Sequence, residues 1–133
     1  MSILDLETAT RLTAVGQEAA AGIGVPMNIA IVDTAGFLIS FQRADGAWLG
    51  SIDPALKKAR TSALFPVPSS SIGEMSQPGG QVYGIEATNG GLISFGGGLP
   101  LVTGDGTAVG AVGVSGGTAD QDVVVAEAIA KAL

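Results

Sequence analysis

Near the start of the chain, apolar side chains recur at the spacing of an amphipathic α-helix. The positions that share this face are Leu6, Ala9, Leu12, Gly16, Ala19 and Ile23. Asp5 can cap the first turn, and Gly22 and Gly24 are suitable stops for a helix. The pattern therefore predicts a helix that ends near Gly22 and covers a sheet with its apolar face.

After Pro26 the pattern becomes that of β-strands. Residues 27–32 form a nearly continuous apolar run, residues 33–36 have the composition of a turn, and residues 37–42 return as a second strand. The pair Asp53 and Pro54 then suits the start of a second helix, which Pro66 ends, so we predict helix over residues 55–65.

Between residues 66 and 91 the periodicity fails, apart from a possible capped turn from Ser71 to Glu74 and a short segment at residues 82–86, which would be the fifth strand. A long loop within a small domain is more often functional than idle. Glu74, Tyr83 and Glu86 lie in or beside this loop and have side chains that can move protons, so Tyr83 and Glu86 are candidate catalytic residues. The alternative is that they are exposed loop residues.

Residues 95–122 combine many glycines with a strand, turn, strand, helix pattern. The strands are predicted at residues 99–102 and 109–114, joined by a hairpin with an Asp105-Gly106 turn. Thr118 and Gln121 fit the capping box of a last helix that begins near Ala119. We therefore expect one domain over residues 1–133, of the α/β (α+β) class, with helices on both faces of a five-stranded antiparallel sheet.

Four motifs in this order resemble the GlcG-like or HbpS-like haem-degrading family. They are IAIVDTAG (29–36), R-x-D-G-A (43–47), K-A-x-T (58–61) and, after GG-x-P, GAVGVSGG (110–117). Each motif is weak alone, but together they cover nearly the whole chain. The resemblance implies a profilin-like arrangement, symmetric homo-oligomers, and relatives encoded with the breakdown of aromatic acids and glycolate.

Composition narrows the possible partners. The chain has 133 residues, 47% of them hydrophobic and 14% charged, which fits a globule with a single core. Its net charge of -6 with six cations argues against binding of nucleic acid or of an acidic membrane surface. Neither a leader pattern nor a membrane-spanning apolar run stands out, so we expect a cytoplasmic protein.

The cations point to a site for a small anion. Four of the six lie close together in sequence, namely Arg43, Lys57, Lys58 and Arg60. Arg43 can hold a carboxylate with Asp45 fixing its direction, or the two can simply pair and order a loop. Lys57 and Arg60 suit a solvated helix face. Lys58 occupies the first position of the K-A-x-T motif, and Thr61 follows one turn later on the same face, so both are expected to line a pocket.

Backbone amides supply the other half of this site. Gly97, Gly98, Ser115 and Gly116, together with the first turn of the last helix, can donate hydrogen bonds to an anion. The alternative is that these glycines only make turns and close packing. Asp122 in that first turn either stabilises the helix dipole or joins the site.

Haem, the ligand that the resemblance implies, does not match the residues available. Iron in haem is held by His, Cys, Met or Tyr, and the sequence contains neither His nor Cys. Tyr83 has no cation beside it in sequence to keep it ionised, and the acidic residues are too scattered for a metal site. We therefore expect no cofactor and no metal.

Three hypotheses remain. The first is a cofactor-independent catabolic enzyme that acts on a small, unsaturated organic acid by deamination, tautomerisation or hydration, with Lys58, Glu86 or Tyr83 moving the proton. The second is a haem-binding or haem-degrading protein. The third is a non-catalytic sensor or assembly subunit whose glycine-rich segment contacts other subunits. The clustered cations favour the first.

Overall fold

The structure is a computed structural model that describes residues 4–133. Within these residues the sheet has four antiparallel strands in the order β2-β1-β4-β3. The strands are β1 (Asn28–Val32), β2 (Leu38–Arg43), β3 (Gly98–Val102) and β4 (Ala108–Ser115). The helices are α1 (Leu6–Gly22), α2 (Ile52–Leu64), α3 (Ser69–Met75) and α4 (Ala119–Lys131), with 3₁₀ turns η1 (Leu49–Ser51) and η2 (Ile85–Ala87).

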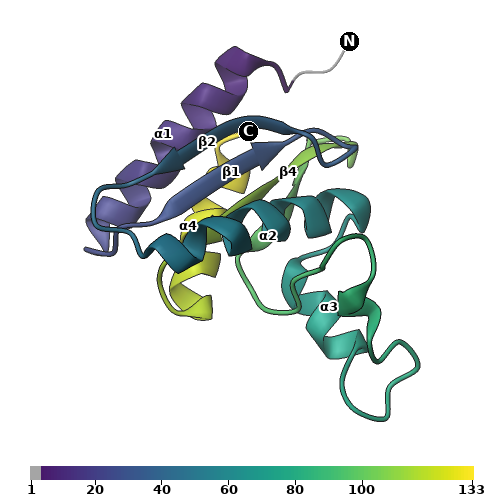
Figure 1. Cartoon of the computed structure of the whole chain (residues 1–133). Coiled ribbons are helices and arrows are strands. Elements are labelled where there is room, and N and C mark those ends of the chain that lie inside the picture. The colour runs from purple at the N-terminus through teal and green to yellow at the C-terminus, as the bar shows by residue number, and fades with distance from the viewer. Residues whose placement is uncertain (1–3) are drawn as a thin grey trace.

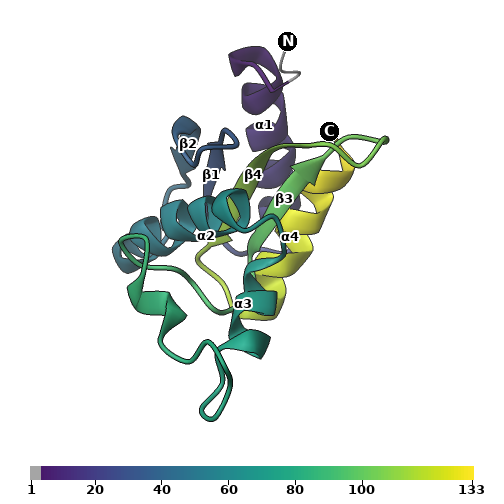
Figure 2. The same ribbon diagram turned by 90° about the vertical axis from the view of Figure 1, so that its right-hand side faces the viewer.

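The expected three-layer arrangement is confirmed. Helices α1 and α4 pack side by side on one face of the sheet, and α2 crosses the other face over β1, β3 and β4 (Figure 1). The view in Figure 2 shows α2 and α4 on opposite sides of the strands. Helix α3 and the long loop after it extend below this body as a projecting arm, residues 69–91.

Strand β1 explains how both faces are filled. All five of its residues are buried, yet they alternate between two cores. Ile29 and Ile31 join the large core under α1 and α4. Ala30 and Val32 join a smaller core under α2. A continuous apolar run is what a strand covered on both sides requires.

Glycines in β4 and β3 decide how closely α2 approaches the sheet. A Cβ atom at Gly113 would lie 2.0 Å from the carbonyl oxygen of Ala55 in α2, and one at Gly98 would lie 2.5 Å from that of Lys58. Gly98 and Gly113 are opposite each other in the β3–β4 pair. Together they form a flat seat on which the backbone of α2 rests.

Two expectations are wrong. The fifth strand does not form, because residues 82–86 make turns and enter η2, with Gly84 in the left-handed region at φ 94° and bonds such as Ile85 N to Val82 O. The second helix begins at Ile52, before the expected start, because η1 leads directly into it. Asp53 therefore lies in the first turn, where it pairs with Lys57 at 3.1 Å. The hairpins and the capping box of α4 are confirmed.

Candidate functional site

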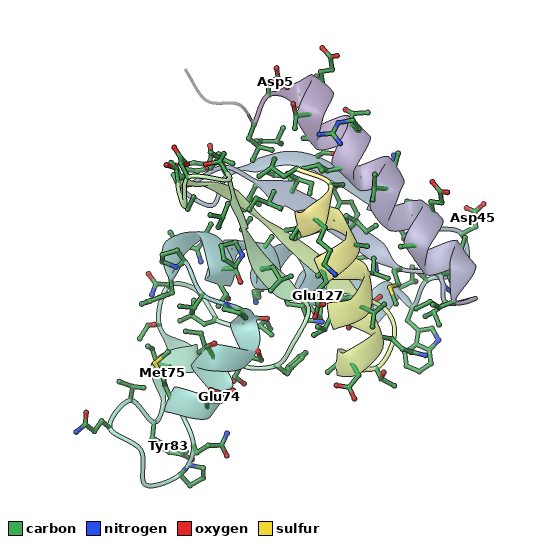
Figure 3. The ribbon with its side chains drawn as sticks, turned by 180° about the vertical axis from the view of Figure 1, so that it is seen from behind. Asp5, Asp45, Glu74, Met75, Tyr83 and Glu127 are labelled. Atoms are coloured by element: carbon green, nitrogen blue, oxygen red, sulfur yellow. The ribbon has the colours of Figure 1, made fainter. Side chains whose placement is uncertain are left out.

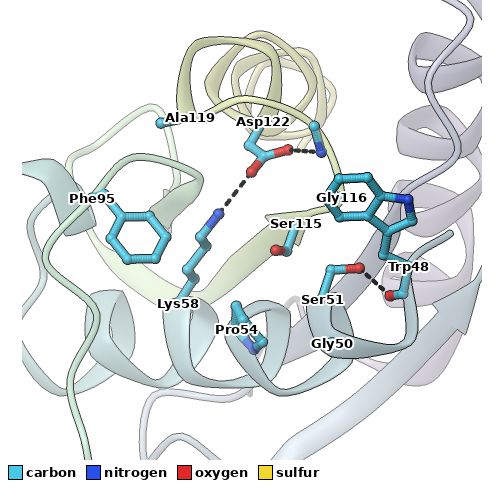
Figure 4. A pocket seen from close by; sticks show the side chains of 11 residues that line it. Trp48, Gly50, Ser51, Pro54, Lys58, Phe95, Ser115, Gly116, Ala119 and Asp122 are labelled. Atoms are coloured by element: carbon cyan, nitrogen blue, oxygen red, sulfur yellow. Dashed lines mark hydrogen bonds and ion pairs between the residues drawn. The ribbon is translucent and has the colours of Figure 1, made fainter.

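A buried ion pair connects α2 to α4 at the carboxyl end of β4. Lys58 Nζ donates to Asp122 Oδ2 at 2.8 Å and to the carbonyl oxygen of Val114 at 2.9 Å (Figure 4). The other carboxylate oxygen, Asp122 Oδ1, accepts from the Gly117 amide at 2.9 Å. Lys58 is 0% exposed and Asp122 is 2% exposed. The two charges are therefore held in a fixed geometry away from bulk water.

Local sequence places each partner. Thr118 accepts from the Gln121 amide, and the Gln121 side chain accepts from the Thr118 amide, which fixes the first turn of α4 and points Asp122 inward. Because Gly98 and Gly113 have no side chains, α2 lies close enough to the sheet for Lys58 to reach β4. Gly97 leaves room for the amine, since a Cβ there would lie 2.7 Å from Lys58 Nζ. Its φ of 125° also favours glycine.

Burial moves the two pKa values toward each other. Loss of water lowers the pKa of Lys58, and the hydrogen bond and charge of Asp122 offset this only in part. Loss of water likewise raises the pKa of Asp122, against the effects of Lys58 and the Gly117 amide. The ionised pair therefore lies closer in free energy to the neutral amine and carboxylic acid than it would in water.

The ion pair forms part of the wall of a pocket of about 330 Å³. Most of the other lining comes from η1, the start of α2 and the turn between β4 and α4: Trp48, Gly50, Ser51, Pro54, Phe95, Ser115, Gly116, Gly117 and Ala119. The Phe95 ring lies over the amine, with 5.1 Å from Lys58 Nζ to the ring centroid. Figure 4 shows Phe95 and Trp48 on opposite sides of the space, with Ser115 between them.

Hydrogen bonds between polar groups hold the part of the pocket wall formed by Ser51 and Trp48. Asn28 Nδ2 donates to Ser51 Oγ at 2.6 Å, and Ser51 Oγ donates to the carbonyl oxygen of Trp48. Asn28 is opposite Ser115 in the β1–β4 pair. Among the described residues, Asn28 Oδ1 has no hydrogen-bond partner although it is buried. This unpaired oxygen belongs to a buried polar side chain that contacts the pocket wall through Ser51.

The structure brings four of the predicted site residues together at this pocket: Lys58, Asp122, Ser115 and Gly116. Three others, Gly97, Gly98 and Thr61, lie beside it with other roles. Gly97 makes room for the Lys58 amine, and its carbonyl oxygen accepts from the Val114 amide at 2.9 Å. The amide of Gly98 donates to Ser69 Oγ at 2.9 Å, so it is already occupied. Thr61 is buried but does not line the pocket; its hydroxyl donates to the carbonyl oxygen of Lys57 and accepts from the Ile93 amide. Gly98 and Thr61 therefore fix the main chain.

The remaining candidates lie elsewhere. Tyr83 is 69% exposed on the projecting arm (Figure 3), and Glu86 is exposed and accepts from Ser94 Oγ. Asp45 lines a separate pocket of about 350 Å³ at the end of α1. Arg43 is exposed at the end of β2 and lines neither pocket, nor does it form an ion pair with Asp45 in the described part of the chain.

Sequence reasoning missed Phe95 and Ser51, and it left open whether Trp48 covers a pocket or anchors its loop. Phe95 carries a signal, because it is an aromatic residue directly before the Gly96–Gly98 run that turns beside Lys58. Ser51 carries none, since its contact with Asn28 joins residues 23 positions apart.

Two further features of residues 4–133 bear on other functions. No group of three or more acidic, His or Cys side chains in this range is arranged to hold a metal ion. Over the same range, none of the helices combines the length and apolar character that crossing a membrane needs.

Comparison with known proteins gives a consistent result. The family described as haem-degrading protein HbpS-like matches residues 4–131. An uncharacterized 15.0 kDa protein from the dhaT-dhaS intergenic region of Citrobacter freundii is 37% identical over 128 residues, which is 96% of this chain and 89% of that protein.

Solved structures agree with the sequence comparison. Klebsiella pneumoniae ORFY has a TM-score of 0.93 at 34% identity, over 98% of this chain and 90% of that chain. The haem complex of PduOC has a TM-score of 0.91 at 32% identity, over 98% and 94%. With the resemblance of the four motifs confirmed in this way, the chain belongs to the HbpS-like haem-degrading protein family.

Proposed function

We propose that the Lys58–Asp122 pocket binds a small organic acid and that the ion pair moves a proton on it, in a tautomerisation that needs no cofactor. The observation that carries this proposal is a buried amine and carboxyl, 2.8 Å apart, in the wall of a pocket. Burial lowers the pKa of Lys58 and raises that of Asp122, which brings the two groups closer in proton affinity and suits a pair that passes a proton.

The surroundings suit a small anion. The pocket volume of about 330 Å³ is at the lower end of the range for small-molecule sites. A ligand carboxylate could be met by the Ser115 hydroxyl and by the positive end of α4, at Ala119. Hydration and hydrolytic deamination require an added water, and eliminative deamination requires a departing ammonia, whereas tautomerisation uses only the proton transfer that Lys58 and Asp122 provide. We therefore place tautomerisation first.

The test combines binding with proton exchange. Small mono- and dicarboxylic acids are screened by the rise in melting temperature, and each acid that binds is followed by NMR for exchange of its α-protons with D₂O. We expect Asp122→Asn to keep binding and to slow exchange by 10²-fold or more, the usual contribution of a general acid or base. Arg43→Ala is the matched control and leaves both unchanged, because Arg43 lies outside the pocket. Unchanged exchange in Asp122→Asn contradicts the proposal.

Haem binding is the second candidate, because PduOC, at 32% identity, was solved as a haem complex. The residues of this chain do not fit the group well. Met27 is fully buried in the core, and Met75 and Tyr83, which lie on the projecting arm (Figure 3), do not line the pocket. A sharp Soret band on titration with haemin, saturating at one haem per chain, would favour haem over the organic acid.

Assembly with copies of itself is a separate proposal, supported by large apolar side chains at the surface. Phe37 is 72% exposed, Trp48 80% and Leu49 71%. Exposed apolar groups of this size are common where subunits meet. Light scattering coupled to size exclusion gives the mass of the assembly, and a monomer at high concentration would contradict the proposal.

A further inference from the structure

Lys58 differs from the other described lysines in a way that proton transfer alone does not require. Lys57 is partly exposed and pairs with an exposed Asp53 on the surface. The Lys58 side chain is 0% exposed along its whole length, and its amine is held by two hydrogen bonds. An amine that is desolvated and fixed beside a carboxyl has the setting of a nucleophilic lysine.

We propose that Lys58 forms an imine with the carbonyl carbon of a 2-oxo acid bound in the pocket. This inference rests on the proposed function, since it names the substrate class and the bond that would make the tautomerisation possible. Protonated imines draw electrons from the neighbouring carbon, so they make its α-proton acidic.

The Lys58 side chain is 0% exposed and the Phe95 ring lies over its amine, so a substrate reaches the amine only when that ring moves. Of the three bonding directions at Lys58 Nζ, one is used by the carbonyl oxygen of Val114 and one by Asp122 Oδ2. The amine also lies 5.1 Å from the centre of the Phe95 ring, which forms part of the pocket wall. Attack along the third direction forms the C–N bond, and the iminium that results keeps one N–H, which can still donate to Asp122, while the contact with Val114 is given up.

Asp122 accounts for each proton of the reaction. It first takes a proton from the ammonium of Lys58. Rotation about the Cε–Nζ bond then turns the freed lone pair toward the substrate, where it forms the C–N bond while the carbonyl π electrons move to oxygen. That oxygen takes the proton back from Asp122 and becomes a hydroxyl. Asp122 then takes a second proton from nitrogen and passes it to the hydroxyl, which leaves as water. The product is an iminium cation beside the Asp122 carboxylate, with no oxidant or reductant needed.

The pocket wall favours the loss of water. Phe95, Pro54 and Trp48 give the site an apolar lining that limits the return of water to the iminium carbon. Phe95 is also 48% exposed, so its ring is the part of the wall that can turn aside to admit the acid. Removing the ring should therefore speed access to the amine.

Borohydride trapping tests the inference on the intact protein. The wild-type chain is incubated separately with pyruvate and with glyoxylate, reduced with sodium borohydride, digested and mapped by mass spectrometry. The expected result with pyruvate is one secondary amine on Lys58, with a mass increase equal to pyruvic acid less one oxygen atom. No adduct on Lys58 with either acid, or equal labelling of Lys57 and Lys58, overturns the inference.

Variants separate this inference from the proposed function. Lys57→Arg is the matched control and keeps full labelling at Lys58, whereas Lys58→Arg loses it. Phe95→Ala is expected to label severalfold faster, and its unchanged or slower labelling contradicts the role given to the ring. If neither acid labels Lys58 but small acids still raise the melting temperature and exchange their protons, the imine is wrong and the proposed function stands. If no small acid binds at all, both are wrong.

Discussion

The Lys58–Asp122 pair allows a sharp test of what a buried ion pair contributes to this fold. We consider Lys58→Met, Asp122→Leu and the double variant, each of which replaces a polar side chain by an apolar one of similar size. Lys58→Met leaves the Asp122 carboxylate buried with only the Gly117 amide as partner. Breaking a buried pair from one side costs about 3–5 kcal/mol, because an uncompensated charge stays behind.

The double variant should behave differently. Desolvation is the largest influence on the pKa of both groups, lowering that of Lys58 and raising that of Asp122, so burial opposes the charged form of each. Replacing a buried pair by packed apolar side chains is often neutral or stabilising by about 1–4 kcal/mol. The Gly117 amide loses its acceptor in exchange, which costs about 1 kcal/mol. We therefore expect the double variant to be more stable than either single variant.

Denaturant unfolding of all four proteins at one protomer concentration measures these differences. For a chain of this size each kcal/mol corresponds to roughly 4 °C in melting temperature, so each single variant should melt roughly 10–20 °C below the wild type. A double variant whose loss equals the sum of the two single losses would show that the side chains act independently. That result would refute both the coupling of the pair and the direction given to its cost.

Three further predictions follow from the same packing and electrostatics. Gly113→Ala should cost about 3 kcal/mol or more in unfolding free energy, because its Cβ would meet the backbone of α2. Gly104→Ala is the control, since a Cβ there meets no atom within 4 Å. Equal stability of the two variants would contradict the close contact between Gly113 and α2. Thr118→Ala should cost about 1 kcal/mol by loss of the α4 cap, and an unchanged midpoint in denaturant would show that the cap is dispensable. Stability should rise with pH between the lowered pKa of folded Lys58 and the unfolded value near 10.5, because there the unfolded chain binds more protons; the rise should vanish in Lys58→Met, and its persistence would assign it to another group.

Local patterns in the sequence were sufficient for most of the fold. The helical spacing from Leu6 onward, the Asp105-Gly106 hairpin and the Thr118 capping box each depend on residues a few positions apart, and the structure has all three. Reliance on local pattern also explains why the strand predicted at residues 82–86 is wrong. The segment has strand-like residues, but a strand needs a partner, and Gly84 turns the chain away from one.

The candidate site is formed by residues that are far apart in the sequence. Sequence alone identified Lys58 by its motif and named Asp122, in the first turn of the last helix, as a candidate for the same site, but it did not predict that the two form an ion pair. Their bond joins residues 64 positions apart, and it exists because glycines at Gly98 and Gly113 let α2 lie against the sheet. Arg43 and Asp45, close to each other in sequence and opposite in charge, turned out to lie outside this pocket.

The amino-acid sequence by itself therefore determined three of the helices, the four strands of the sheet with their caps and turns, and the absence of His and Cys as haem ligands. Only the tertiary structure decided which charged groups meet, which amine loses its water, and which aromatic rings line the pocket. The physical reason is that caps, turns and periodicity are set by neighbouring residues, whereas desolvation and ion pairing are set by whatever packing brings alongside.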